Sequence, residues 1–226
     1  MHTIKTWRNP YDNGWATTKK EEIDFKPGIT ILVGCNGIGK STLLRNIKSQ
    51  LEEENIPYYM FDNLKDGGRE SIDRMIHEGK DLGTVARMLS ASEGENISNN
   101  LGIMARKLWK FIVSGENDNK NFDDIFNPEK SKKVTSKERW ILLDAVDSGY
   151  SIDNVVDLKS LFDLVLGDAQ KMDCEVYIVA SANEYELAAD MNCLDVAEGE
   201  YVTFSDYEDF RTFILESRNK KNVREK

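Results

Sequence analysis

The stretch of residues 28–44 constrains this chain most, because it contains a complete phosphate-loop pattern between the two elements that such a loop requires. The pattern G-x-x-x-x-G-K-[ST] is filled by Gly34, Gly39, Lys40 and Ser41. Before it, the apolar run from Ile29 to Val33 predicts a strand buried on both faces. After it, leucine and isoleucine residues at helical spacing predict a helix. A strand, a glycine-rich loop and a helix in this order predict a binding site for phosphate groups.

The residue types in this loop have the chemistry that a bound phosphate chain needs. Glycines let backbone N–H groups turn inward, and the positive end of the helix dipole faces the same anion. We expect Lys40 to reach the β- and γ-phosphates and the Ser41 hydroxyl to hold Mg²⁺. The alternative, a glycine-rich turn before an ordinary helix, leaves the full motif unexplained. The residues expected to surround the phosphates are Asn36, Gly37, Ile38, Gly39, Lys40, Ser41 and Thr42.

Hydrophobic periodicity along the rest of the chain predicts a single α/β domain over its 226 residues, with a mainly parallel sheet. The other strands are expected at residues 3–8, 22–25, 58–61, 139–144, 175–180, 194–196 and 201–204. The first two would form an antiparallel N-terminal hairpin, and the last two a final hairpin. We expect a helical insertion at about residues 64–114 and a mobile polar loop at about residues 115–138. Ser205 and Glu208 predict a capping box for the last helix, followed by a frayed tail from Arg218 onward.

Composition excludes some classes of function. With 30 Lys and Arg against 40 Asp and Glu, the formal net charge is −10, so contact with DNA would need a local basic patch or a partner. The three cysteines are widely spaced without a C-x-x-C pair, which indicates neither a disulfide framework nor a zinc site. The first residues lack the apolar core of a signal peptide, and no apolar run approaches the ~20 residues that span a bilayer. We therefore expect a cytoplasmic protein.

A second acidic position completes the metal chemistry. A phosphate-bound Mg²⁺ usually needs a carboxylate at the end of a neighbouring strand. Asp144 follows the apolar residues 140–143 and is the candidate. The alternative is an acid that merely ends a strand.

The order of these motifs resembles the ATP-binding cassette superfamily, and more closely its soluble branch of chromosome-maintenance and DNA-repair ATPases. The resemblance rests on the blocks at residues 24–28, 34–44, 92–95 and 141–149. It implies a P-loop ATPase that binds ATP and Mg²⁺. In such families the Ser-x-Gly-Glu segment contacts the γ-phosphate held by a second subunit, so the resemblance implies a head-to-tail homodimer in which Ser92 and Gly94 act in trans. A surface turn before a helix is the alternative for this short segment.

The chain departs from the family pattern in three ways. The usual catalytic glutamate after the strand aspartate is Ala145, whose methyl group can neither accept a proton nor orient water. Either Asp147 takes over as catalytic acid, or hydrolysis is slow, or the alanine is an engineered change that traps the ATP state. The histidine that the family has after the strand at 175–180 is replaced by Asn183, which can donate a hydrogen bond to a γ-phosphate but carries no charge. Only about fifty residues separate Lys40 from Ser92, which leaves no room for a coiled-coil arm.

Two further ligands are implied by position alone. Asn63 follows the strand at 58–61, where the family places a glutamine that contacts Mg²⁺ and the attacking water, although an ordinary turn residue fits the sequence equally well. Trp15 lies where cassette ATPases often keep an aromatic ring for the adenine. Tyr11 and Trp7 compete for that role, and packing beneath the hairpin is the alternative use of each ring.

The function expected from these observations is ATP-driven dimerisation with weak ATPase activity. A DNA-related process is one option for its role. Three other classes stay open: a non-hydrolysing nucleotide switch, the motor subunit of a transporter, and a DNA-associated clamp. A switch fits Ala145 and Asn183, whereas a motor would need a membrane partner. Nucleic acid is a possible partner that the net charge does not indicate.

Overall fold

The computed structural model describes residues 1–6, 18–62, 93–115 and 136–224. Its central element is a six-stranded sheet with the strand order β4-β5-β6-β3-β7-β8. The first five strands in this order run parallel, and β8 pairs antiparallel with β7. This arrangement confirms the predicted mainly parallel sheet. The strands are β3 (Gly28–Val33), β4 (Tyr58–Asp62), β5 (Glu138–Asp144), β6 (Glu175–Ser181), β7 (Cys193–Asp195) and β8 (Glu200–Val202).

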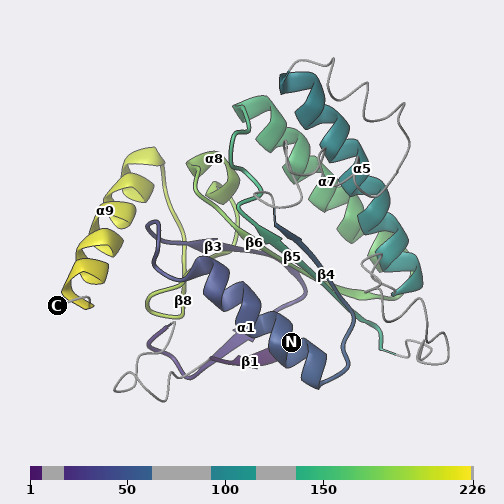
Figure 1. Ribbon diagram of the computed structural model, residues 1–226, viewed down its shortest axis with the longest axis horizontal. Helices are drawn as coiled ribbons and strands as arrows, with labels where there is room; N and C mark the ends of the chain where they lie inside the picture. Colours follow the sequence, from purple (N-terminus) through teal and green to yellow (C-terminus); the bar gives the residue numbers. More distant parts are fainter. Residues whose placement is uncertain (7–17, 63–92, 116–135, 225–226) are drawn as a thin grey trace, which may run out of the picture.

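Helices cover both faces of this sheet (Figure 1). On one face lie α1 (Lys40–Glu53) and a two-stranded antiparallel sheet of β1 (His2–Lys5) and β2 (Glu22–Phe25), which confirms the predicted N-terminal hairpin. On the other face lie α5 (Glu93–Ser114) and α7 (Ile152–Lys171). A short helix, α8 (Tyr185–Ala188), follows β6, and the last helix, α9 (Tyr207–Arg224), packs with its first half against the core.

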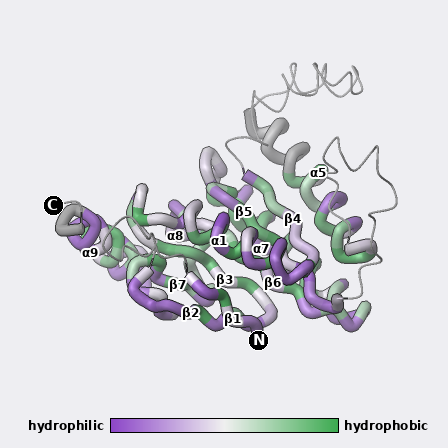
Figure 2. Tube along the Cα trace, turned by 60° about the horizontal axis from the view of Figure 1, so that its bottom comes forward, coloured by the Kyte–Doolittle hydropathy of each residue, from purple (hydrophilic) through white to green (hydrophobic). Residues whose placement is uncertain are grey.

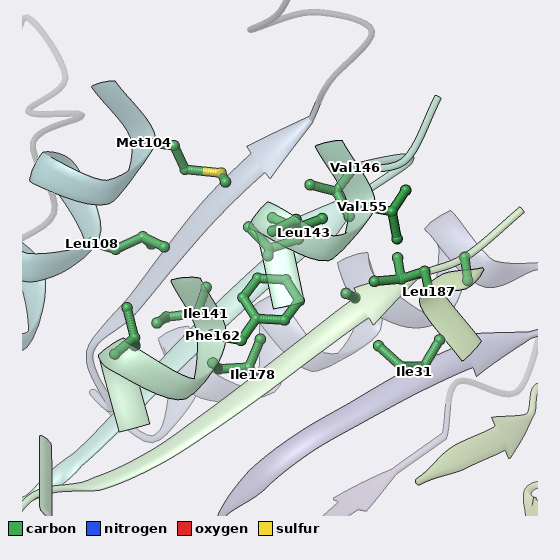
Figure 3. Packing of buried hydrophobic residues seen from close by; sticks show 14 of the residues in the cluster. Ile31, Met104, Leu108, Ile141, Leu143, Val146, Val155, Phe162, Ile178 and Leu187 are labelled. Atoms are coloured by element: carbon green, nitrogen blue, oxygen red, sulfur yellow. The ribbon is translucent and has the colours of Figure 1, made fainter. Parts of the chain in front are cut away.

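The alternation of side chains along the buried strands produces the two cores. In β5, Ile141 and Leu143 face α7, whereas Trp140 and Leu142 face α1. Phe162 of α7 lies over Ile141 and Ile178 in Figure 3. Figure 2 shows the same pattern as hydropathy, with the central strands mainly green and much of α9 purple. Strands buried on both faces must be almost wholly apolar, which explains why the sequence made them easy to recognise.

The topology corrects one expectation about the acid-bearing strand. We expected Asp144 at the end of a strand next to the phosphate-loop strand, but β6 lies between β3 and β5. Because all three strands run parallel, their carboxyl ends still meet at one edge of the sheet. Leu32 pairs with Ser181, and Leu143 pairs with Ala180. The residues that follow β3, β5 and β6 therefore share one rim of the molecule.

The described strands begin and end within a few residues of their expected positions. Other expectations fared differently. The predicted helical insertion is described only from Glu93 onward, where α5 begins, and most of the polar loop lies outside the described residues. The prediction of a frayed tail from Arg218 onward is wrong, because α9 continues as a helix to Arg224. The capping box lies one residue later than predicted: the Asp206 carboxylate accepts the Asp209 N–H at 2.9 Å.

Candidate nucleotide-binding site

The loop between β3 and α1 has the conformation that its glycines permit. Gly34 has φ +140° and Gly37 has φ +77°, which are values that other residues rarely adopt. A Cβ on Gly34 would lie 2.9 Å from Cγ2 of Ile38, so the backbone also passes too close for a side chain there. Ile38 itself is buried and anchors the middle of the loop in the core.

The start of α1 is built to face an anion. Its N-cap, Gly39, is left-handed and provides no side-chain cap, and the first turn of the helix contains no acidic residue. The first N–H groups of a helix lack intrahelical partners, and together they form the positive end of the helix dipole. The residues of this first turn begin with Lys40 and Ser41, and none of them carries a carboxylate. The local sequence therefore leaves these donors to a ligand.

Lys40 lies inside the loop rather than in solvent. Its ammonium donates to the Gly34 carbonyl at 2.7 Å, and the residue is only 9% exposed. Burial lowers the pKa of Lys40, while electrostatic interactions with Asp147, Cys35 and Asp144 oppose this shift, in decreasing order. A cation held this way, close to two carboxylates, is at the centre of the predicted phosphate site.

Asp144 is held at the rim by a residue that the sequence analysis missed. The Ser181 hydroxyl at the end of β6 donates to Oδ1 of Asp144 at 2.8 Å and accepts the Ala145 N–H at 2.7 Å. Ser181 thus joins the end of β6, the strand between β5 and β3, to the end of β5, and it orients the Asp144 carboxylate. A small polar residue at the end of a strand as apolar as β6 was the signal that could have identified it.

Asp147 joins two turns at the rim. The residue is 1% exposed, and its Oδ2 accepts the backbone N–H groups of Asn183 at 2.7 Å and Glu184 at 2.8 Å. The Asn183 amide also donates to Oδ1 of Asp147 at 3.4 Å and to the Ser148 hydroxyl at 3.2 Å. Burial raises the pKa of Asp147, while the backbone donors and Lys40 lower it. This arrangement makes Asp147 a positioning residue that ties the turn after β5 to the turn after β6.

The comparisons with known proteins fit this geometry. The family model described as an AAA domain matches residues 23–183, which include the phosphate loop, Asp144 and the turn at Asn183. The chain belongs to the AAA domain family. This membership confirms the prediction of a P-loop ATPase.

The other two comparisons add less. Among solved structures, the AAA domain is similar to the crystal structure of the ADP conformation of an ATP-binding cassette of an ABC transporter. The two are 12% identical with a TM-score of 0.44, and the match covers 97% of this chain and 99% of the other. Among curated proteins, none matches the sequence.

The backbone of the AAA domain is unusual directly after Asp144. Ala145 has φ +50°, a left-handed conformation that is uncommon for a residue with a Cβ. Its N–H is bound by Ser181, and its side chain is a methyl group. The position after the strand acid therefore supplies no proton acceptor, as the sequence predicted.

A hollow of about 600 Å³ adjoins the phosphate loop. Its lining comes from three elements: the loop itself, the turn between β6 and α8, and α9 from its middle onward. The contribution of α9 was missed, because nothing in the local sequence shows that this helix folds back onto the loop. The lining residues are Gly34, Cys35, Asn36, Asn183, Glu184, Ile214, Arg218 and Lys221.

Several predicted ligands cannot be placed. Trp15, Asn63 and Ser92 lie outside the described residues. Gly94 lies in the first turn of α5, as predicted for the segment that opens this helix. The residue before Asn63, Asp62, pairs in register with Asp144, so β4 ends at the same rim as the other strands.

The described protein atoms do not form a metal cage by themselves. No cluster of three or more His, Cys, Asp or Glu side chains in the described part of the chain could hold a metal ion. Ser41 and Asp144 offer one hydroxyl and one carboxylate at the rim. This donor set fits Mg²⁺, which nucleotide sites usually bind through one or two protein oxygens, with phosphates and water completing the shell.

Proposed function

We propose that this AAA domain binds MgATP at the phosphate loop, and that bound ATP closes a head-to-tail dimer which hydrolyses it slowly. The observation that carries the proposal is the start of α1, where an uncapped helix N-terminus, left-handed Gly39 and buried Lys40 converge. Three features that each favour an anion at one point support a phosphate chain more strongly than any of them alone.

The residues of the chain divide the work of binding. Lys40 exchanges the Gly34 carbonyl for phosphate oxygens, which are stronger acceptors because they are charged. The backbone N–H groups from Asn36 to Thr42 surround the phosphates. Ser41 and Asp144 would hold Mg²⁺, which when bound neutralises charge on the phosphate oxygens. Ser181 keeps the Asp144 carboxylate in place.

Slow hydrolysis follows from the groups beside this site. Ala145 has no side chain that could accept a proton from water, and the buried Asp147 carboxylate is already bound to the turn at Asn183. An enzyme without a positioned base loses about 10²- to 10⁴-fold in rate. These observations favour an ATP-dependent switch over a fast ATPase.

Support for the dimer comes from the segment at residues 92–95, whose counterparts in cassette ATPases complete the γ-phosphate site of a second subunit. Gly94 in the first turn of α5 would let a phosphate approach the backbone closely. A DNA-related role rests on the resemblance alone. No described helix has the length and apolar character needed to cross a membrane, so a transporter motor would depend on a partner.

The test is size-exclusion chromatography with light scattering, without nucleotide and with MgADP or MgATP. We expect a dimer of the wild type with MgATP alone, and none with Lys40→Ala. The matched control is Lys48→Ala on the same helix, whose ammonium lies 3.7 Å from Glu52 away from the loop and whose loss should leave the dimer intact. An ATP-induced dimer in Lys40→Ala would contradict the binding site, and a wild type that binds ATP as a monomer would contradict the dimer.

A further inference from the structure

The last helix contacts the phosphate loop directly. The Ser217 hydroxyl, on a residue that is 2% exposed, accepts the Cys35 N–H at 3.1 Å. One turn later, the Lys221 ammonium donates to the Asn36 carbonyl at 3.4 Å. In Figure 1 the helix stands beside the turn that joins β3 to α1. The loop is therefore supported from the C-terminal end of the described chain as well as by its own strand and helix.

The sequence spacing explains how one helix reaches both the core and the loop. Ser217 and Arg218 lie three and four residues after Ile214, and Lys221 lies four and three residues after them, so all four share one face of α9. Ile214 packs against the buried clusters on the sheet. Because the apolar part of this face is docked, the polar part is held at a fixed place against the loop.

Positive charge gathers on this wall of the hollow beside the loop. Arg218 and Lys221 line it from α9, and among the described residues of its lining Glu184 is the one acid. The Lys221 ammonium is so close to the loop that a Cβ on Gly37 would lie 2.5 Å from it. Two cations against the loop in a chain of net charge −10 indicate a site for an anion.

We propose that Lys221 and Arg218 are phosphate-binding residues that contact the terminal phosphate of ATP, an inference that rests on the proposed function. The Lys221 ammonium already points its N–H at an oxygen of the loop, and a charged phosphate oxygen is a stronger acceptor than a carbonyl. The hollow also contains Asn183, the side chain expected at the γ-phosphate. At that place the two cations would contact a phosphate that ATP has and ADP lacks.

The consequence is a preference for ATP over ADP that the phosphate loop alone does not explain. Lys40 is expected to reach the γ-phosphate, which ADP lacks. The other phosphates that Lys40 and the loop amides contact are present in both nucleotides. Lys221 and Arg218 would add contacts made only to the triphosphate.

The experiment is isothermal titration calorimetry of the full chain with MgATP and MgADP. For Lys221→Gln and Arg218→Gln we expect ATP affinity to fall about tenfold to a hundredfold, as for a lost hydrogen bond to a charged group. ADP affinity should stay within about twofold, because the shared contacts remain. Lys221→Arg keeps the charge and should retain the ATP preference.

Lys220→Gln is the matched control. It removes the same charge from the adjacent position, where the Lys220 ammonium lies 3.2 Å from Glu198, and it should change neither affinity. Wild-type ATP affinity in Lys221→Gln and Arg218→Gln, or an equal loss for ATP and ADP, would overturn the inference while leaving the proposed function intact. Failure of the wild type to bind ATP, or ATP binding unchanged in Lys40→Ala, would overturn both.

Discussion

The hydrogen bond between Ser217 and Cys35 offers a direct measure of how firmly α9 holds the phosphate loop. Ser217→Ala removes the acceptor of a buried N–H and creates a void no larger than one oxygen atom. A buried donor left without a partner costs about 1–3 kcal/mol. For a domain of this size, each kcal/mol lowers Tm by about 2–4 °C. We therefore expect the free energy of unfolding to fall by about 1–3 kcal/mol, and Tm by about 2–12 °C.

The assay is urea unfolding followed by circular dichroism, with Ser160→Ala as the control. The Ser160 hydroxyl donates to the Val156 carbonyl on the exposed side of α7, so its loss should change stability by less than about 0.5 kcal/mol. Equal stability of Ser217→Ala and Ser160→Ala would refute the reasoning, because it would show that the Cys35 N–H gains nothing from α9.

Two other substitutions test the rim of the sheet. Ala145→Glu should raise the steady-state rate of phosphate release by about 10-fold or more, because it supplies a proton acceptor; an unchanged or lower rate would show that the missing glutamate does not limit turnover. Asp147→Ala should lower the free energy of unfolding by about 2–4 kcal/mol, because two N–H groups lose a charged acceptor. Urea unfolding would check this, and wild-type stability in that variant would exclude the structural role of Asp147.

Local patterns were sufficient to predict most of the fold. The strands β3, β5 and β6 are short apolar runs between turn residues, and the phosphate loop has a fixed spacing that depends on neighbouring residues alone. Ser151 caps α7 in the same local way, since its hydroxyl accepts the Asn154 N–H. Such features follow from interactions within a few residues, which a sequence shows directly.

The features that the sequence did not predict depend on long-range contacts. The strand order places β6 between β3 and β5, and so makes Ser181 a neighbour of Asp144. The docking of α9 brings Ser217 to Cys35 across most of the chain. The tail was expected to fray because it is charged, but the charged residues lie on a helix whose other positions pack on the core. Even the cap of α9 was misplaced by one residue, because Ser205 and Asp206 can both accept an N–H.

The position of β3 in the sheet has a consequence for how the protein is made. This strand is synthesised before both of its neighbours in the sheet, because Gly28 pairs with Tyr177 and Ile31 pairs with Cys193. A nascent chain that has reached only α7 contains the phosphate loop but neither strand that flanks β3. Contacts so distant in sequence form slowly, and unpaired strands attract each other in the meantime. Affinity for nucleotide should accordingly emerge only after β6 and β7 have been synthesised and have paired with β3.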